Sequence, residues 1–299
     1  MKIGVIKICI YIIVFQCAAT RVFCQDIDKI RQDFEKQSSG KGGIPYGNNP
    51  AAGKYYNIRG LKMYCEVYGQ GKPLLIIHGN GGSISNFVYQ IPFFSKKYKV
   101  IIADSRAQGK SADPADSLSY EMMADDYAAL LDEMKIDSAY VIGWSDGGIN
   151  ALLLAIRHPG KVAKMAITGT NLQPDTNAVY QEVWDMVIPA YNQLKQKTSL
   201  SPEEKAEFKL LKLLCEQPHI PLTDLNKIAV PALVMGGDHD VIKVEHTVQI
   251  FENIPMAYLY IFPASGHSTP VVYSQDFNAK VDKFFSSPYR KIQGEGRFF

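Results

Sequence analysis

The sequence predicts an α/β protein in which a mostly parallel β-sheet carries helices on both faces. Short apolar runs without polar alternation recur along the chain, which is typical of strands buried on both faces. Segments with helical periodicity, such as residues 120–134 and 148–157, lie between these runs. The 299 residues are 46% hydrophobic and 21% charged, a composition that provides apolar side chains for one large core.

The expected strands follow one another from residue 55 to residue 262. Because they alternate with helical segments, we expect the later strands to be parallel to one another. The opening two are joined at Gly60 and form a pair. The eight predicted strands are residues 55–58, 62–68, 73–77, 100–103, 140–142, 164–167, 232–235 and 258–262.

One segment breaks this alternation, because residues 171–226 contain no strand-like run. Residues 177–197 form a helix candidate that Pro189 interrupts. Ser201, followed by Pro and two Glu, has the pattern of an N-terminal capping box for a second helix. We therefore predict a small helical cap inserted into the α/β domain. Its larger side chains are expected to roof a pocket in part. These are Tyr180, Trp184, Met186, Tyr191 and Phe208.

The first 24 residues are predicted to be a secretory signal peptide. Lys2 precedes a short apolar stretch at residues 8–15, and small residues follow it. This stretch is too short to span a bilayer as a helix. We expect an exported protein, periplasmic or secreted, with no stable membrane association after cleavage; the alternative is an uncleaved membrane anchor. The remaining domain boundaries are predicted as a short helix and linker at 25–53, the α/β domain at 54–287 (cap at 171–226) and a C-terminal tail at 288–299.

Composition also limits the ligands. The net charge of +2 and the absence of a basic stripe argue against a nucleic-acid partner. Three of five cysteines lie in the leader, so Cys65 and Cys215 are expected to be buried thiols and not a disulfide framework. No cluster has zinc-ligand spacing, so neither a metal site nor a cofactor is expected. The oligomeric state is left open.

A nucleophile is predicted at Ser145. Residues 143–147 read Gly-Trp-Ser-Asp-Gly, which matches G-x-S-x-G, and they lie between the predicted strand 140–142 and a helix. Glycines at both ends allow a turn sharp enough to lift the serine clear of the sheet. The following helix N-terminus favours negative charge beside it.

A serine hydroxyl needs a base that takes its proton, and the base needs an acid that orients it. His267 follows the last predicted strand and therefore lies at the carboxyl edge of the sheet, where active sites of open α/β sheets are found. Two acids follow the preceding strand. Asp240 is predicted to be the acid of the triad, and Asp238 is the alternative, expected instead to cap a turn.

The Gly-rich segment 78–82, His-Gly-Asn-Gly-Gly, follows the first apolar strand. Backbone N–H groups in such a loop can bind the oxyanion that forms during acyl transfer. We expect the N–H groups of Asn80 and Asp146 to form this oxyanion hole, and we expect His78 to be structural.

These four motifs, in this order, resemble the α/β-hydrolase superfamily, and the resemblance covers roughly residues 54–287. Residues 104–111 also resemble the family's D-x-R-G-x-G-x-S loop, with Ala107 in place of the usual Gly, and are expected to be structural. Residues 143–149 and 164–171 resemble the biphenyl hydrolase-like enzymes, also called valacyclovir hydrolases. That resemblance implies an esterase that acts on amino-acid esters.

We therefore expect a serine hydrolase that cleaves a small-molecule carboxylic ester through an acyl-enzyme on Ser145. Trp144, Trp184 and Asp146 are the expected substrate contacts. The same triad would also serve a cofactor-free haloperoxidase or perhydrolase, a carbon–carbon bond hydrolase or an amidase. A non-catalytic ligand-binding protein is the alternative from a different class.

Asp146 is an unusual neighbour for a nucleophile, because its carboxylate raises the cost of an oxyanion forming beside its own N–H. One interpretation is local, since an acid in the first turn of a helix is favoured by the helix dipole. The other is functional: the carboxylate pairs with a cationic group of the substrate, such as the free α-amino group of an α-amino-acid ester.

Overall fold

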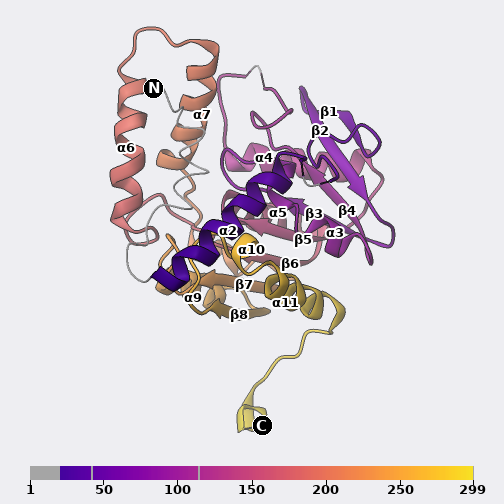
Figure 1. Cartoon of the computed structure of the whole chain (residues 1–299). Coiled ribbons are helices and arrows are strands. Elements are labelled where there is room, and N and C mark those ends of the chain that lie inside the picture. Colours follow the sequence, from indigo (N-terminus) through magenta and orange to yellow (C-terminus); the bar gives the residue numbers. More distant parts are fainter. Residues whose placement is uncertain (1–20, 42, 114, 299) are drawn as a thin grey trace.

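The computed structural model describes residues 21–41, 43–113 and 115–298 (Figure 1). Its centre is an eight-stranded sheet with the order β1-β2-β4-β3-β5-β6-β7-β8. Strand β2 pairs antiparallel with β1 and β4, and the other neighbours are parallel. The predicted mostly parallel sheet is therefore confirmed. The strands are β1 Gly53–Ile58, β2 Leu61–Tyr68, β3 Lys72–Ile77, β4 Tyr98–Ala103, β5 Ala139–Trp144, β6 Val162–Thr168, β7 Ala232–Gly237 and β8 Ala257–Phe262.

Helices cover both faces of the sheet. Alternate side chains of each strand point to opposite faces, so that Leu75 and Ile77 join one apolar cluster while Leu74 and Ile76 join the other. The first cluster lies under α4 (Tyr120–Glu133), α5 (Asp146–Arg157), α8 (Leu222–Leu225) and α9 (Val244–Asn253). The second lies under η1 (Ile84–Phe87), α3 (Ile91–Phe94), α10 (Thr269–Val272) and α11 (Ser274–Ser286).

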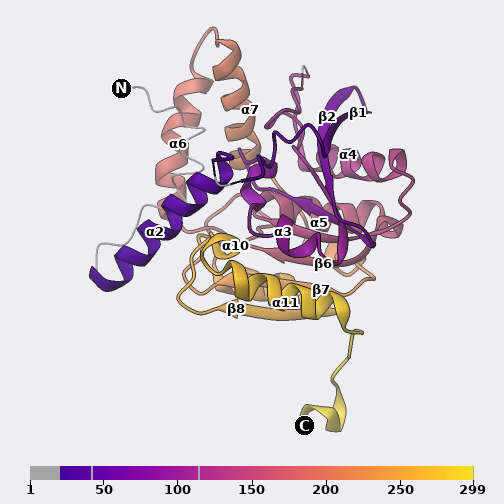
Figure 2. The same cartoon turned by 45° about the vertical axis from the view of Figure 1, so that its right-hand side comes forward.

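The segment between β6 and β7 forms the predicted helical cap. Its helices α6 (Gln181–Lys195) and α7 (Pro202–Glu216) lie side by side beyond the edge of the sheet and share a small apolar cluster (Figures 1 and 2). The predicted capping box is present: Ser201 Oγ accepts from Glu204 N–H, and the Glu204 carboxylate accepts from Ser201 N–H. The interruption predicted at Pro189 is wrong, because α6 continues through it. Packing of the apolar face of α6 against α7 compensates for the one backbone hydrogen bond that proline removes.

The N-terminal segment is packed onto the domain, where the sequence predicted a linker. Glu66 of β2 is buried and accepts hydrogen bonds from the backbone N–H groups of Gly47 and Asn49, and from the hydroxyls of Tyr64 and Tyr68. A buried carboxylate is stable only with such donors. These bonds fix the chain before β1 in place. Residues 1–20 of the predicted leader (1–24) lie outside the described part of the chain, and residues 21–24 begin α2, so export stays a prediction.

Helix α2 (Arg21–Ser38) is longer than the sequence predicted and lies against η1 and α10 (Figure 2). The Tyr89 hydroxyl donates to the Asp33 carboxylate at 2.7 Å, and the Phe34 ring lies 6.2 Å from the Tyr89 ring. Since η1 follows the loop 78–82 and α10 follows His267, α2 supports two segments that carry predicted site residues. Among the described residues, no helix is long and apolar enough to cross a membrane.

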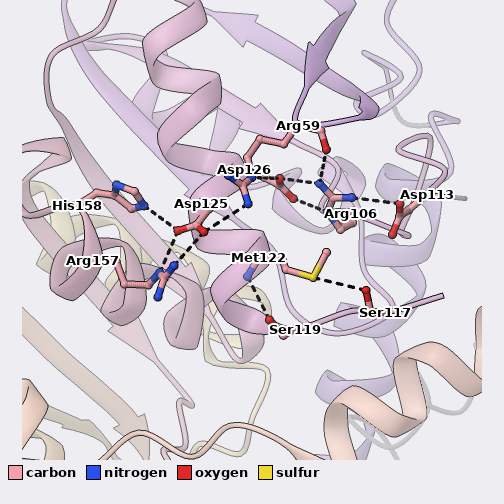
Figure 3. Close-up of polar contacts among 10 residues, drawn as sticks. All are labelled: Arg59, Arg106, Asp113, Ser117, Ser119, Met122, Asp125, Asp126, Arg157 and His158. Carbon is pink, nitrogen blue, oxygen red and sulfur yellow. Dashed lines mark hydrogen bonds and ion pairs between the residues drawn. The ribbon is translucent and has the colours of Figure 1, made fainter. Parts of the chain in front are cut away.

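The loop after β4 is held by a buried ion network (Figure 3). Arg106 donates two hydrogen bonds to Asp126 of α4, at 2.6 and 2.7 Å, and one to Asp113 at 3.1 Å. Asp113 also pairs with Lys209 of the cap helix α7, at 3.6 Å. The structural role predicted for this loop therefore extends to the base of the cap.

Residue 107 of this loop is Ala, where the D-x-R-G-x-G-x-S pattern that it resembles has Gly, and this difference costs conformational energy. Ala107 has φ 62°, in the left-handed region that favours glycine. Cys65 is buried as predicted, whereas Cys215 is only half-buried, and neither forms a disulfide. The C-terminal tail leaves the domain after α11 and ends in the short helix η3 (Gly294–Phe298) (Figure 1).

Candidate active site

Ser145 lies on a sharp turn between β5 and α5. Its backbone has φ 59° and ψ −123°, a conformation rarely adopted by residues other than glycine. Space around the turn is limited, since a side chain at Gly143 would overlap the Gly147 carbonyl, and one at Gly147 would overlap the Ile77 carbonyl. The two glycines of the motif are therefore required by close backbone approach, and they leave the serine projecting from the end of the sheet.

The three predicted triad residues meet at the carboxyl ends of β5, β7 and β8. Ser145 Oγ lies 3.0 Å from His267 Nε2, and His267 Nδ1 lies 2.6 Å from Asp240 Oδ1. All three come from loops that follow parallel strands, which is why residues 27 and 122 positions apart converge. With Nδ1–H donating to Asp240, Nε2 is left to accept the serine proton.

Asp238, the alternative acid, has a different position. Its carboxylate accepts hydrogen bonds from the N–H groups of Ala264 and Ser265 and lies 2.8 Å from His239 Nδ1. The hydrogen bond with His239, together with those from the backbone, lowers the pKa of Asp238 to about 2. Asp238 thus holds the loop that carries His267, while Asp240 contacts the imidazole itself.

Opposing effects act on the pKa of His267. Burial disfavours the charged imidazolium, but the charge and hydrogen bond of Asp240, with a contribution from Asp146, leave the pKa of His267 above its usual value. An imidazolium formed during a reaction is therefore stabilised. A base in this position is active when neutral, so the activity of the site should rise as His267 loses its proton.

The loop 78–82 lies directly over the nucleophile. A Cβ on Gly79 would be 3.0 Å from Ser145 Cβ. His78 is buried and structural in its contacts: its Nδ1 donates to the Gly79 carbonyl at 2.8 Å, and its Nε2 accepts from Ser105 N–H at 2.9 Å. Asn80 lines the same pocket as Ser145, which is where its predicted role in an oxyanion hole requires it to be.

The Asp146 side chain is 2% exposed and is held by a residue of the loop 78–82. Asn80 Nδ2 donates to Asp146 Oδ2 at 2.9 Å. Burial raises the pKa of Asp146 to about 6, although the nearby Tyr120 hydroxyl of α4, the hydrogen bond from Asn80 and the charge of His267 partly offset the effect. Asp146 lies in the first turn of α5, where the helix dipole favours an acid. The described hydrogen bond of its carboxylate comes from a side chain and not from a free N–H group of the helix.

This raised pKa predicts a pH-dependent stability for Asp146→Asn. A carboxyl whose pKa rises on folding stabilises the folded state below its unfolded pKa of 3.8, and that stability is lost as the pH rises towards 6. Asparagine removes the ionisation. We expect Asp146→Asn to increase the free energy of unfolding at pH 8 by up to about 3 kcal/mol, and to change it little near pH 4. Urea unfolding at both pH values measures this.

The matched control is Asp238→Asn, since the pKa of Asp238 is lowered on folding. That variant should lose stability at pH 8, where the wild-type carboxylate is ionised and hydrogen-bonded. A gain for Asp238→Asn, or no gain for Asp146→Asn at pH 8, would contradict the assigned environments.

A cavity with an open mouth lies above Ser145. Trp144 and Trp184, both predicted to contact substrate, line it. Trp144 also donates its indole N–H to the His267 carbonyl at 2.9 Å and so helps to hold the base. The other lining residues are Gly79, Asn80, Gly82, Asn86, Ser145, Asp146, Asn171, Val179, Val183, Val187, Leu214, Val241, Ile242 and His267.

Of the five cap side chains predicted to roof the pocket in part, only Trp184 lines it. Tyr180 and Met186 are 42% and 43% exposed, and Tyr191 stacks on Phe208 between α6 and α7, with ring centroids 5.7 Å apart. The aliphatic residues Val183, Val187 and Leu214 occupy the wall instead. Sequence reasoning missed them because it selected side chains by bulk. The spacing of 183, 184 and 187 on one helix face carried the signal.

Comparisons with known proteins agree with this architecture. Residues 72–214 match the alpha/beta hydrolase fold family. The serine hydrolase BPHL of Homo sapiens is 24% identical over 76% of this chain and 84% of its own length. The 2-hydroxymuconate semialdehyde hydrolase of Pseudomonas sp. (strain CF600) is 25% identical over 80% of this chain and 95% of its own.

Solved structures show the same fold. The enol-lactonase from Burkholderia xenovorans LB400 superposes with a TM-score of 0.67 at 20% identity, covering 78% of this chain and all of that one. An esterase from Exiguobacterium antarcticum gives 0.67 at 24% identity, covering 79% and 100%. The chain therefore has the α/β-hydrolase fold, and it is similar to hydrolases with that fold. Within that class it resembles the serine hydrolase BPHL, as residues 143–149 and 164–171 implied.

Proposed function

We propose that this protein is a serine hydrolase that cleaves a small carboxylic ester through an acyl-enzyme formed on Ser145. The observation that carries the proposal is the unbroken chain from Ser145 Oγ through His267 to Asp240, in which Ser145 and His267 line an open cavity. Among the described residues, no group of three or more His, Cys, Asp or Glu side chains is placed to hold a metal ion.

In the proposed reaction Ser145 Oγ attacks the ester carbonyl carbon while His267 Nε2 takes its proton, and Asp240 stabilises the imidazolium. The oxyanion accepts hydrogen bonds from the N–H groups of Asn80 and Asp146. The carbon–oxygen bond of the ester breaks, and the alcohol leaves with the proton from His267. Water then gives a proton to His267 and attacks the acyl carbon, and the serine leaves with that proton as the carboxylic acid is released.

The charge of the cavity supports a choice of substrate. Within the described structure, none of the residues that line it is Lys or Arg. With a pKa of about 6, Asp146 is mostly ionised at neutral pH. A cationic substrate group at this carboxylate would pair with a buried charge, and an α-amino group lies only two bonds from the carbonyl carbon of its ester. We therefore propose α-amino-acid esters as the preferred class.

A carbon–carbon bond hydrolase is the second candidate, because the chain is 26% identical over 270 residues to the 2-hydroxy-6-oxo-6-phenylhexa-2,4-dienoate hydrolase of Burkholderia cepacia. The name of that enzyme's substrate describes a carboxylate. The cavity here presents an acid, and no lysine or arginine lines it among the described residues. Since like charges repel in a buried site, this argues against an anionic substrate. A non-catalytic binding protein would fail to react with a fluorophosphonate at Ser145.

The substrate proposal is tested with an amino-acid methyl ester and its N-acetylated analogue. Wild-type protein should prefer the free amine about tenfold or more in kcat/KM, since a charge-assisted hydrogen bond in a largely dry site contributes about 1–3 kcal/mol. Asp146→Ala should lose that preference and still cleave the acetylated ester. Equal rates on both esters in the wild type would instead favour a neutral ester as substrate.

A further inference from the structure

After His78, the loop over the nucleophile contains one side chain larger than hydrogen. Residues 79–82 are Gly, Asn, Gly and Gly, and Gly81 has φ 65°. Within the loop the Gly82 N–H donates to the Gly79 carbonyl at 3.1 Å. Because glycine lets the backbone sample many conformations, the direction of the N–H of residue 80 depends on further contacts. Gly79 and Gly82 leave little room for a larger residue. An added Cβ on Gly79 would meet Ser145, and one on Gly82 would meet Asn86. The His78 side chain holds the start of the loop at the Gly79 carbonyl. Among residues 79–82, Asn80 has the one side chain that can anchor the loop to the nucleophile turn and the cap.

The Asn80 amide makes contacts in two directions. Its Nδ2 donates to Asp146 Oδ2 on the nucleophile turn at 2.9 Å, and to the Leu210 carbonyl of the cap helix α7 at 3.4 Å. The hydroxyl of Tyr120, which is fully buried at the start of α4, also lowers the pKa of this carboxylate. The polar contacts of Asn80 thus link the loop to the nucleophile turn and to the cap.

We propose that Asn80 is a positioning residue: its side chain, anchored on Asp146 and on the cap, fixes its own backbone N–H at the oxyanion. The inference rests on the proposed function. In it the backbone N–H of Asn80 binds the oxyanion, and the side chain holds that N–H in position. An error of about 1 Å in a donor weakens transition-state stabilisation far more than substrate binding. The anchor therefore acts on kcat, and a substrate group that contacts Asp146 or the cap influences the oxyanion site through it.

The test begins with Asn80→Ala, which removes the amide and keeps the backbone N–H. On a neutral p-nitrophenyl ester, we expect kcat to fall about 10- to 100-fold with KM changed less than about threefold. The affinity for a neutral trifluoromethyl ketone, whose adduct carries an oxyanion, should fall by the same factor as kcat/KM. Asn80→Gln, which keeps an amide, should recover part of kcat.

A double-mutant cycle separates the anchor from other roles. If Asn80 acts through Asp146, Asn80→Ala combined with Asp146→Ala should be little worse in kcat than the poorer single variant. If the factors by which the two single variants lower kcat multiply in the double variant, the two side chains act independently, and the proposal is wrong. Asn253→Ala, the same change at a half-buried position at the end of α9, is the matched control and should keep wild-type kcat.

Failure of the positioning role can be told apart from failure of the proposed function. Wild-type protein that neither hydrolyses esters nor reacts with a fluorophosphonate would overturn the proposed function. Active wild type together with an unchanged kcat in Asn80→Ala would overturn the positioning role alone. A thermal unfolding midpoint for each variant shows whether a lower rate reflects loss of folded protein, and a loss of kcat that follows only this midpoint would also contradict the proposal.

Discussion

Replacing Ser145 by alanine is expected to lower kcat for ester hydrolysis by about 10^4-fold or more, and His267→Ala is expected to cost a similar factor. The effects should not multiply in the double variant, because nucleophile and base act as one unit across the 3.0 Å hydrogen bond. Folding should be nearly unchanged, since the serine hydroxyl is a small group at the cavity wall. Steady-state kinetics with a p-nitrophenyl ester measure kcat, and circular dichroism measures folding.

The two acids near His267 supply the internal control. Asp240→Asn should reduce kcat less than loss of the base does, because the imidazole remains but its tautomer and orientation are no longer fixed. Asp238→Asn should have a smaller effect, because its carboxylate contacts the loop backbone and His239 and not the base. If Asp238→Asn proved the more damaging of the two, the acid would have been assigned to the wrong residue.

The largest stability effect is expected at Arg106. Its side chain is 4% exposed and forms hydrogen bonds with Asp126 and Asp113, which are themselves buried (Figure 3). Arg106→Ala would remove the buried cation that both carboxylates share and leave them only the pairs with Arg59 and Lys209. Breaking one partner of a buried ion pair costs about 3–5 kcal/mol. The free energy of unfolding in urea at pH 7 measures the loss. If the variant fails to fold, Arg106→Lys replaces it in the test. This variant keeps the charge but not the forked geometry of the guanidinium, so it should lower the free energy of unfolding by a smaller amount that can still be measured.

Arg157→Ala is the matched control in the same region. Arg157 is 40% exposed and pairs with Asp125 at 2.9 Å (Figure 3). An exposed ion pair of this kind contributes about 1 kcal/mol or less. Equal losses for the two variants would show that the Arg106 network is not the buried framework that its contacts describe.

Much of the fold could be predicted because its signals are local. Each buried strand forms a short apolar run, and each predicted triad residue follows such a run directly, so the parallel sheet brings Ser145, Asp240 and His267 to one edge. Strand ends were less certain, since β5 continues to Trp144 where the apolar run stops at Ile142.

What the sequence did not reveal depends on contacts between distant segments. No local pattern links Tyr120 to Asp146, and none links Glu66 to the backbone before β1. The same holds for Pro189, whose effect on α6 is decided by packing against α7 and not by helix propensity. The residues of the cap that face the cavity likewise follow from how its helices dock, which bulk alone did not predict.

The cavity has two walls of different origin. Loops at the end of the sheet provide the triad, whereas the insertion between β6 and β7 provides Val183, Trp184, Val187 and Leu214. Substitutions confined to these four positions leave the proton transfers between serine, histidine and aspartate untouched. The insertion is thus a part of the protein in which specificity can evolve, by natural divergence or by a focused library, while the chemistry that it serves is inherited unchanged.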